Sequence, residues 1–566
     1  MRYIKLILFL IGFCSYTNVC AQLSTNEKPV SFGRESELRV SRRSEKPTVI
    51  MPELDIDKIT EEDYKAEESN EPPRFGFRHR VNYDLANAGT WYEFSNGDKL
   101  WRLDITCPNA LSVSFCYNKF WIPQGGKLFV YSKDKAQFLG AFTSRNNKGD
   151  REHLRGFATG LIYGSDVVLE YYQPKDVTSD AIISVEYIVH GYRFIWDNGT
   201  KLSNDCSCMV DINCSEGDNW QIEKKAVAKI LVGNEWYGTG FLVNSTDIAH
   251  RPLFLTANHC ISQYGDAVGD SILDTFIFCW NYEVQTCKSM NIAPNYSTTG
   301  ATILANNIAT DFALLELAED PFDIDGYTPY YLGWDNSGQS GLPGVCIHHP
   351  QGEVKKISTV LNTPISSFYS EEPQFPDSHW EVEWKSTQNG YGVTIQGSSG
   401  SPLLNASHKV IGQLHASDSD CGLWKYKPSL YGKFNVSWTG NNNDSIQRRL
   451  SCWLDPLNYG FQTWEGLYVL PEDSTMTANG QIDNNICISS TGQLVIKGDV
   501  ELTGNNRIIV DAGGKLIVDG GTLSNADIIV KPGATIRITH EGMVMTRRGF
   551  KAPLGAIVDI KSGKIL

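Results

Sequence analysis

The chain has 566 residues and a formal net charge of −15 at pH 7. A chain of this length exceeds one ordinary hydrophobic core, and roughly three or four domains are expected. No run of Lys and Arg is long enough to follow a phosphate backbone, so the composition argues against nucleic acid as the main partner.

The N-terminus has the pattern of a secretory signal. Arg2 and Lys5 precede an apolar stretch from Leu6 to Phe13, and small or polar residues follow as far as Ala21. The apolar stretch is far shorter than the roughly 20 residues that cross a bilayer, so it is no transmembrane segment. We expect a signal peptide over 1–21 and a protein secreted to the medium or the cell surface.

The cysteine count suits an exported chain. Of the 14 cysteines, Cys14 and Cys20 fall in the signal, which leaves an even number in the mature chain. Disulfides are therefore expected. The sequence has no CxxC pair and its histidines are scattered, so we predict neither a metal site nor a cofactor.

The first part of the chain divides into a leader and a strand-rich block. Residues 22–73 are charged and poor in aromatic residues, which predicts a flexible or loosely docked leader. Over 74–202, short apolar and aromatic runs alternate with Gly, Asn and Asp turns, which favours a β-sandwich. Cys107 and Cys116 bracket the short stretch PNALSVSF, and we expect them to form a disulfide.

Two further strand-rich blocks follow. A polar break, DNGTKLSNDCS, precedes a region that we place at 203–468. In 469–566, short hydrophobic strands and Gly or Asn turns repeat at intervals of roughly ten residues, which predicts a small β-helix-like or sandwich domain. The predicted fold class is all-β throughout.

Three residues of the middle block together suggest hydrolytic chemistry. PLFLTANHCIS leads an apolar strand into His259, NNIATDFALLEL places Asp311 just before a buried strand, and QGSSGSPLLN carries Ser399 in a Gly-Ser turn. Each feature alone is commonly structural. Together they supply a hydroxyl nucleophile, an imidazole to take its proton and a carboxylate to orient the imidazole.

The order of these residues adds to the argument. His, Asp and Ser follow one another at strand ends in an all-β block, which is the chain order of the two-barrel serine proteases. The N–H groups of Gly397 and Ser399 would then form the oxyanion hole.

The block from Cys208 to about Leu467 resembles the bacterial lysyl endopeptidases, which have the chymotrypsin-like fold. The matching stretches cover nearly all of it: CMVDINC, GTGFLVN, FLTANHC, WNYEVQTC, TDFALLEL, GWD, IHHP, GVTIQGSSGSP, VIGQLH, YGKF, SWTG and WLDP. The resemblance implies His259 as general base, Asp311 as its orienting acid and Ser399 as the nucleophile that forms an acyl-enzyme.

The resemblance also bears on the cysteines. It implies the disulfides Cys208–Cys421 and Cys214–Cys287. In the family, the cysteine after the general base pairs with one just before the TGxLVN strand, but Gly238 stands there in this chain. Cys260 must then pair elsewhere, and we expect Cys279. The partners of four others stay open: Cys206, Cys346, Cys452 and Cys487.

The position that sets specificity in the family departs from its pattern. The family selects lysine with an aspartate two residues before the Tyr-Gly of YGKF, and Ser429 stands there. A hydroxyl compensates a buried ammonium poorly, so a lysine preference is not inherited. His415, expected to line the S1 pocket, resembles a histidine of glutamyl endopeptidases, and Asp418 or Asp420 could instead supply a displaced acid. We expect a charged P1 residue, either Lys/Arg or Glu.

Maturation is expected to involve the block over 74–202, which resembles the pro-region of the lysyl endopeptidases. Ser398 stands where trypsin-type zymogens carry the aspartate that pairs with a new N-terminus, so that activation route is not expected. We predict that the pro-domain assists folding or inhibits until cleavage between Asn198 and Cys208, where Lys201 is the basic residue.

The predicted function is that of a secreted serine endopeptidase acting on proteins or peptides, with its own pro-domain as a further partner. The C-terminal block would either be a purely structural extension, or serve for attachment to the cell surface or for binding of large substrates. The alternative is a catalytically inactive, protease-like surface adhesin or binding protein. The presence of all three catalytic residue types argues against that alternative.

Overall fold

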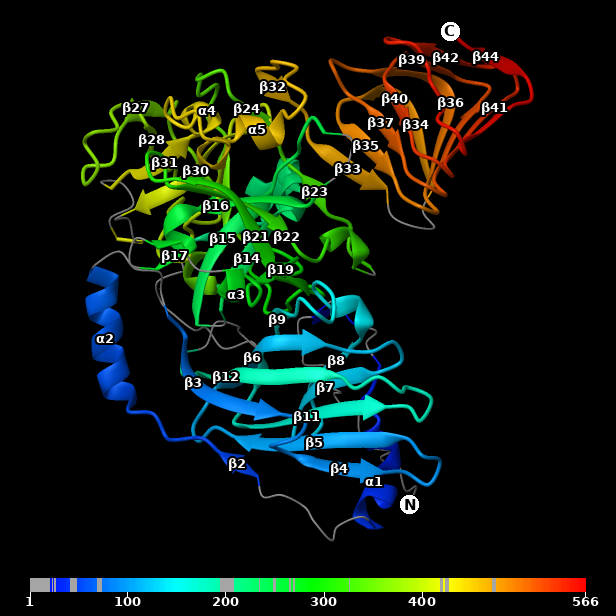
Figure 1. Cartoon of the computed structure of the whole chain (residues 1–566). Helices are drawn as coiled ribbons and strands as arrows, with labels where there is room; N and C mark the ends of the chain where they lie inside the picture. Colours follow the sequence, from blue (N-terminus) through cyan, green and yellow to red (C-terminus); the bar gives the residue numbers. More distant parts are fainter. Residues whose placement is uncertain are drawn as a thin grey trace, which may run out of the picture.

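The structure is a computed structural model. It describes the residues 21–22, 24, 27–40, 48–68, 74–193, 208–233, 235–247, 251–263, 266–267, 270–324, 326–417, 421–422, 427–470 and 475–566. Within these ranges, strands predominate and form three units in chain order, coloured blue to cyan, green to yellow and orange to red (Figure 1). No helix in the described ranges is both long enough and apolar enough to span a membrane. The all-β prediction is confirmed.

The N-terminal unit is a sandwich of two sheets, antiparallel except for the pairing of β2 with β5, with flanking segments. Its elements are β1 (Ala21–Gln22), α1 (Ser31–Val40), β2 (Val49–Ile50), α2 (Ile56–Glu68), β3 (Gly76–Asp84), β4 (Thr90–Glu93), β5 (Lys99–Thr106), β6 (Ser112–Trp121), β7 (Lys127–Ser132), β8 (Phe138–Phe142), η2 (Ser144–Asn146), β9 (Arg155–Ala158), β10 (Ile162–Tyr163), β11 (Asp166–Gln173) and β12 (Ile182–Gly191). One sheet has the order β10-β6-β12-β3 and the other β2-β5-β11-β7-β8. The side chains between them form one buried cluster that includes Trp101, Phe115 and Tyr171.

The predicted disulfide between Cys107 and Cys116 is absent from the structure. Both thiols are reduced and buried. Cys107 packs inside the sandwich core, whereas Cys116 faces the middle unit, with its Sγ 3.6 Å from the carbonyl oxygen of Gly233. Because side chains alternate between the two faces of a strand, closeness in sequence did not bring these thiols to the same face.

The leader is more ordered than its composition suggested. Helix α1 docks on the sandwich: the N–H of Ser31 donates to Glu170 (3.1 Å), and the ring of Phe32 contacts that of Tyr131 edge-on. Helix α2 is tied by Asp63, which accepts a hydrogen bond from the hydroxyl of Tyr192 (2.7 Å). The few apolar and acidic residues of the leader therefore suffice to dock two helices.

The middle unit consists of two large sheets that pack against each other. Its elements are β13 (Val210–Asp211), η3 (Ser215–Trp220), η4 (Glu223–Ala226), β14 (Val227–Val232), β15 (Trp236–Leu242), β16 (Leu253–Ala257), η5 (Asn258–Cys260), β17 (Ser262–Gln263), β18 (Asp266–Ala267), α3 (Asp270–Leu273), β19 (Ile277–Trp280), β20 (Tyr296–Thr299), β21 (Ala301–Asn307), β22 (Phe312–Leu317), η6 (Pro321–Asp323), β23 (Tyr330–Tyr331), β24 (Gly333–Asp335), β25 (Val345–His348), η7 (Pro350–Gly352), β26 (Lys356–Thr359), β27 (Ile365–Ser367), β28 (His379–Val382), β29 (Pro402–Leu404), β30 (Lys409–Ser417), β31 (Ser429–Lys433), α4 (Phe434–Thr439), η8 (Ile446–Arg448), α5 (Ser451–Leu454) and β32 (Thr463–Trp464).

The strand order of these two sheets determines where polar side chains can meet. The first sheet runs β1-β20-β19-β14-β15-β16-β22-β21, and the second runs β13-β26-β25-β29-β30-β31-β28-β27. Buried residues of both sheets, such as Leu255 and Leu404, belong to one core cluster. Segments at the ends of β16, β22, β29 and β30 are brought together between the sheets.

The C-terminal unit is a parallel β-solenoid. Its strands are β33 (Leu467–Leu470), β34 (Thr475–Ile482), β35 (Asn485–Ile488), β36 (Gln493–Leu502), β37 (Ile508–Val510), β38 (Lys515–Asp519), β39 (Thr522–Ala526), β40 (Ile528–Val530), β41 (Thr535–Thr539), β42 (Gly542–Thr546), β43 (Ile557–Ile560) and β44 (Gly563–Ile565). Leu494 pairs with Leu516, which pairs with Ile536, so equivalent apolar residues stack along the interior. Of the two predicted architectures, the β-helix-like one is correct.

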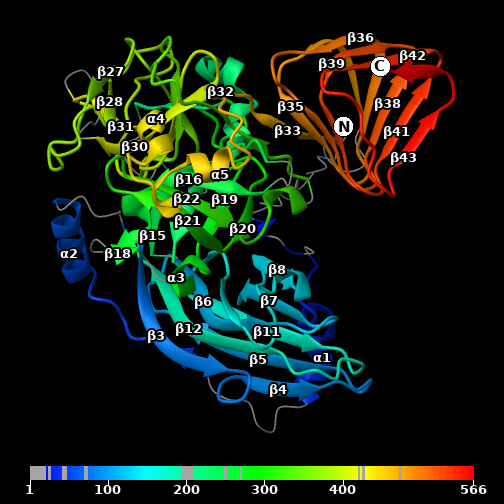
Figure 2. The ribbon, with the colours of Figure 1, turned by 45° about the horizontal axis from the view of Figure 1, so that its top comes forward.

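The middle unit contacts both of its neighbours. The turned view shows the solenoid beside the middle unit and away from the sandwich (Figure 2). Strand β33 of the solenoid pairs with β23, and the guanidinium of Arg507 donates to the carbonyl of Thr246 (2.9 Å). On the other side, Lys148 of the sandwich donates to the carbonyl of Asp274 (2.8 Å).

Candidate active site

His259 and Asp311 are held together by two hydrogen bonds. Strand β16 ends at Ala257, and the short η5 turn presents His259, while Asp311 precedes β22 in a left-handed conformation (φ 55°). The carboxylate accepts from the backbone N–H of His259 at Oδ1 (2.9 Å) and lies 2.6 Å from its Nδ1 at Oδ2. The imidazole is therefore fixed in both position and tautomer, with Nδ1–H toward the acid.

The charges of this pair stabilise each other. Burial alone would lower the pKa of His259, but the Asp311 carboxylate, together with Cys260, outweighs burial and raises that pKa well above its ordinary value. Burial would likewise raise the pKa of Asp311, whereas the neighbouring imidazoles of His259 and His415 hold it below the ordinary value. The pair is therefore suited to stabilising an imidazolium at His259.

Ser399 lies in a turn that is braced by the first sheet. Gly397 (φ 85°) and Gly400 (φ 82°) both have left-handed backbones that favour glycine. Thr239 of β15 donates from its hydroxyl to the carbonyl of Gly397 (2.7 Å) and from its N–H to that of Ser399 (2.9 Å). A Cβ at Gly397 would lie 2.8 Å from the ring of Tyr237. The turn therefore has little room to move.

The same turn offers hydrogen-bond donors next to Ser399. Among the described parts of the chain, no hydrogen bond uses the N–H of Gly397 or of Ser399. Ser399 is partly exposed, and its carbonyl oxygen lies 3.9 Å from the Sγ of Cys260, the residue after His259. The sequence-predicted residues His259, Asp311 and Ser399 thus all come to the junction of the two sheets.

Ser398 has a purely internal environment. Its hydroxyl contacts Nδ1 of His348 (2.8 Å), whose Nε2 contacts the hydroxyl of Ser358 (3.0 Å). Burial lowers the pKa of His348 to about 3, so this imidazole is neutral. Ser398 therefore helps to support the turn from behind.

His415 lies beside the candidate triad. Its Nε2 is 3.8 Å from Oδ2 of Asp311, and its ring stacks against that of His259 at a centroid distance of 6.0 Å. Its other nitrogen, Nδ1, contacts Nε2 of His379 (2.9 Å), a residue of β28 that the sequence analysis did not single out. In the sequence, His379 is a lone histidine in DSHWEVEW, with no motif to mark it.

Ser429 belongs to a buried cluster of hydroxyl groups. Its Oγ accepts from the indole N–H of Trp384 (2.9 Å) and contacts the hydroxyls of Thr394 (2.8 Å) and Ser417 (3.1 Å). The hydroxyl of Ser417 donates in turn to the carbonyl of Thr394 (2.8 Å). The two acids considered for specificity, at 418 and 420, lie outside the described residues.

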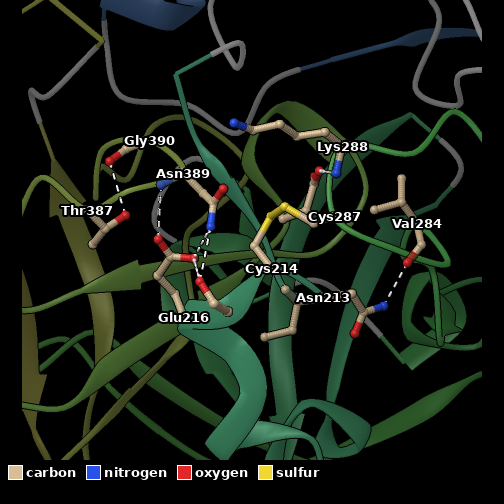
Figure 3. Close-up of a disulfide and its surroundings, with 12 residues drawn as sticks. Asn213, Cys214, Glu216, Val284, Cys287, Lys288, Thr387, Asn389 and Gly390 are labelled. Atoms are coloured by element: carbon tan, nitrogen blue, oxygen red, sulfur yellow. Dashed lines mark hydrogen bonds between the residues drawn. A yellow bond between two sulfur atoms is a disulfide. The ribbon is translucent and has the colours of Figure 1, made fainter.

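Two disulfides tie the start of the middle unit to later segments: Cys208–Cys421 and Cys214–Cys287, the pairs that the resemblance implied. Beside Cys214, Glu216 accepts from the N–H (3.1 Å) and side-chain amide (2.9 Å) of Asn389 (Figure 3). Burial opposes the charge of Glu216, but these and other hydrogen bonds lower its pKa to about 2.

The expected disulfide between Cys260 and Cys279 is absent. Cys260 lies next to Gly238, whereas Cys279 is on β19, between Lys229 and Ser297 of the neighbouring strands. Strands β14 and β15 separate β19 from β16, which leads into Cys260. Two intervening strands, each about 4.8 Å from the next, place the thiols too far apart for a bond.

The sequence predicts no metal site, yet two histidines and an aspartate lie close together here. His259, Asp311 and His415 have ligand atoms within 4.8 Å of one another, and two imidazoles with a carboxylate could bind zinc. However, Nδ1 of His259 and Oδ2 of Asp311 are only 2.6 Å apart. Two ligands that are each about 2 Å from a zinc ion lie farther apart than that, so the arrangement suits a shared proton better.

Part of the chain is similar to known proteases. The family model "Lysyl endopeptidase, C-terminal domain" matches residues 202–432. A lysyl endopeptidase of Pseudomonas aeruginosa is 28% identical over 291 residues, which cover 47% of this chain and 58% of that protein. The chain thus spans a little over half the length of this relative.

A solved structure, an HtrA-type protease AlgW with tripeptide, matches at 14% identity with a TM-score of 0.26 and covers 39% of this chain and 60% of that chain. The family model match falls largely on the middle unit, which contains the His259–Asp311 pair and the Ser399 turn. The middle of the chain is therefore similar to lysyl endopeptidases, which are proteases.

Proposed function

We propose that the chain is a secreted serine endopeptidase in which Ser399, His259 and Asp311 act as a catalytic triad. The observation that carries the proposal is the buried Asp311 carboxylate, bound to both N–H groups of His259 in a domain of a protease family. This arrangement presents Nε2 of His259 as the free base.

The reaction would proceed through an acyl-enzyme. Nε2 of His259 accepts the hydroxyl proton of Ser399 as Oγ attacks the peptide carbonyl. The resulting oxyanion accepts hydrogen bonds from the N–H groups of Gly397 and Ser399. Breakdown of this intermediate expels the amine, which takes the proton from His259. Water then attacks the ester with His259 as base, and the acid leaves as the Ser399 hydroxyl is restored.

Active-site labelling tests the proposal. The exported protein is expected to react with a fluorophosphonate probe at Ser399, and Ser399→Ala should abolish both label and peptide hydrolysis. Ser401→Ala, in the same segment, is the control and should keep the label. A wild-type protein that is folded but takes no label would instead support the protease-like binding protein.

For specificity, we propose a charged P1 residue, with Glu and Lys/Arg as the two candidates. The hydroxyl cluster around Ser429 favours Glu, because hydroxyls can donate to a carboxylate and supply no negative charge to an ammonium. Profiling of cleavage sites in a denatured protein mixture reports P1 directly. A flat or purely aliphatic profile would contradict this proposal.

We also propose that the N-terminal unit is a pro-domain that is removed after secretion. The extensive contacts of this unit with the middle unit and the two disulfides support a folding or inhibitory role in an oxidising compartment. If maturation is autocatalytic, Ser399→Ala leaves residues 22–202 attached. Normal processing of that variant would show that another protease makes the cut.

A further inference from the structure

A chain of hydrogen bonds runs from a backbone carbonyl to the edge of the candidate triad. The hydroxyl of Ser378 donates to the carbonyl of Phe375 (2.7 Å) and contacts Nδ1 of His379 (2.7 Å). Nε2 of His379 then contacts Nδ1 of His415 (2.9 Å). Nε2 of His415 is the end of the chain and faces Asp311.

The position of each proton follows from the first donor. Because the Ser378 hydroxyl gives its proton to a carbonyl, its oxygen can only accept from Nδ1–H of His379. His379 is buried, and burial with the nearby His415 lowers its pKa to about 3, so it carries one proton. Its Nε2 is then an acceptor, and the proton in its contact with His415 must come from Nδ1 of His415.

This order leaves Nε2 of neutral His415 without a proton. The nitrogen lies 3.8 Å from Oδ2 of Asp311, beyond hydrogen-bonding distance, and both atoms carry lone pairs. Oδ2 therefore serves only Nδ1 of His259, at 2.6 Å. The other tautomer of His415, with its proton on Nε2, would donate to the same oxygen and compete with His259.

We propose that His379 is a positioning residue that sets the tautomer of His415 and thereby reserves Asp311 for His259. The inference rests on the proposed function of the triad. It assigns to the buried pair of Ser378 and His379 a part in peptide hydrolysis, although neither contacts the reacting atoms.

The charged groups around His415 determine the pH range over which His415 stays neutral and leaves Asp311 to His259. Asp311 and Glu371 attract a proton to His415, and His259 repels one, while His379 is itself faced by Lys433. Burial outweighs the attraction and keeps the pKa of His415 below its ordinary value. Protonation of His415 on Nε2, which this lowered pKa displaces to more acidic solution, makes it a cation that competes for Asp311.

Two substitutions distinguish the effect of the hydrogen bond between His379 and His415 from the effect of side-chain packing at position 379. In His379→Gln the amide oxygen can still accept from Nδ1 of His415, whereas His379→Leu removes the acceptor at similar volume. We expect His379→Leu to lower kcat/KM for a short peptide by about tenfold. In the pH profile of kcat/KM for His379→Leu, the acidic limb should move to lower pH, because Asp311 would stabilise the imidazolium of His259 less. His379→Gln should recover most of both properties.

The tautomers can also be observed without turnover. In the full-length Ser399→Ala chain, nitrogen-15 spectra of labelled histidines should show a proton on Nδ1 of both His379 and His415 at neutral pH. A proton on Nε2 of His415, an unshifted pH profile in His379→Leu, or equal losses in both variants would overturn the inference. A wild-type chain that takes no fluorophosphonate label would overturn the proposed function instead, and the spectra would still decide the proton order.

Discussion

Single residues at the candidate site carry more information than their types alone. Ser429 occupies the position at which the resembled family has an aspartate, and it is completely enclosed by Trp384, Thr394 and Ser417. Its hydroxyl is therefore buried among the polar side chains of these neighbours. His415, the histidine expected in the pocket, has its Nε2 3.8 Å from Oδ2 of Asp311.

Ser429→Asp tests this view of the pocket. A carboxylate at this position would offset the charge of a lysine ammonium, so the cleavage profile should shift toward lysine by at least tenfold in kcat/KM. Ser429→Asn, which adds similar bulk without charge, is the control. An unchanged profile in Ser429→Asp, with labelling of Ser399 retained, would show that position 429 does not select P1.

Gly238 and Cys260 have the geometry of a missing disulfide. A Cβ at Gly238 would lie 3.8 Å from the Cβ of Cys260 and 3.1 Å from its Sγ. Disulfides have Cβ atoms about 3.8 Å apart. We expect Gly238→Cys to form this bond and to raise the free energy of unfolding by roughly 3 kcal/mol, the value for a loop of about 20 residues.

Thiol counting and denaturant unfolding with and without reductant measure this effect. Gly238→Ser is the matched control and should gain nothing under oxidising conditions. A folded Gly238→Cys variant with one more free thiol than the wild type, rather than one fewer, would contradict the prediction.

His79 and His190 make the sandwich sensitive to acid. Their rings are 5.7 Å apart, and the ring nitrogens of His190 are buried without a hydrogen-bond partner among the described residues. Burial lowers the pKa of both, that of His190 to about 4. Protons therefore bind the unfolded form first, so the stability contributed by neutral His190 is full above about pH 6.5 and falls as the pH approaches 4.

His190→Gln should reduce this acid sensitivity. Between pH 7 and pH 4.5 the melting temperature of the N-terminal unit in the full chain should fall less in the variant than in the wild type, because one titrating group is gone. His153→Gln, at an exposed position, is the control. Equal falls in wild type and His190→Gln would contradict the prediction.

At the scale of elements, the Ser399 turn is fixed by glycine conformation and by strand β15. A Cβ at Gly400 would meet the carbonyl oxygen of Thr239 and the hydroxyl of Thr256 at 2.3 Å, in addition to the strain of its positive φ. Gly460 also has a positive φ (71°), but a Cβ there would meet nothing within 4 Å. Substitutions at these two glycines therefore distinguish the cost of a steric clash from the cost of backbone strain.

Gly400→Ala is expected to cost more than 2 kcal/mol of stability and to abolish fluorophosphonate labelling, whereas Gly460→Ala should cost about 1 kcal/mol and keep the label. Denaturant unfolding and labelling measure both effects. Similar losses in the two variants would show that the clash with β15 does not hold the turn in place.

At this scale, the features that could be predicted from the sequence are those formed by residues close together in the chain. Strand-end motifs marked His259, Asp311 and Ser399, and regular turns marked the C-terminal ladder. The disulfide between Cys107 and Cys116 was predicted wrongly, because face and strand order are set by the packing of distant segments. His379 was not predicted, since its contact with His415 joins β28 to β30 across β31.

At the scale of the whole molecule, the middle unit shares buried surface with both neighbours. On the sandwich side, Phe75 packs with Tyr237 in a cluster that also contains Cys116 and Tyr282. On the solenoid side, Cys487 and Ile509 belong to the same core cluster as the middle unit. The solenoid is therefore a docked extension that continues the hydrophobic core.

A chain that ends at residue 471 tests how independent the solenoid is. It retains β33 and the whole site, so it should still hydrolyse short peptides, but with lower stability because the core loses Cys487 and Ile509. Peptide assays, thermal unfolding and binding of large substrates measure these effects. Loss of short-peptide hydrolysis in a folded chain of this length would show that the solenoid is part of the catalytic unit.

The disulfide Cys208–Cys421 has a consequence for the order of folding. It joins residues 213 positions apart, whereas paired residues in the solenoid ladder, such as Leu516 and Ile536, are neighbours in adjacent coils. Contacts between residues close in sequence form quickly, and contacts across long loops form slowly. During folding, the bond between Cys208 and Cys421 can therefore close only after the second sheet of the middle unit has brought the two thiols together, whereas each solenoid coil can form on the coil before it.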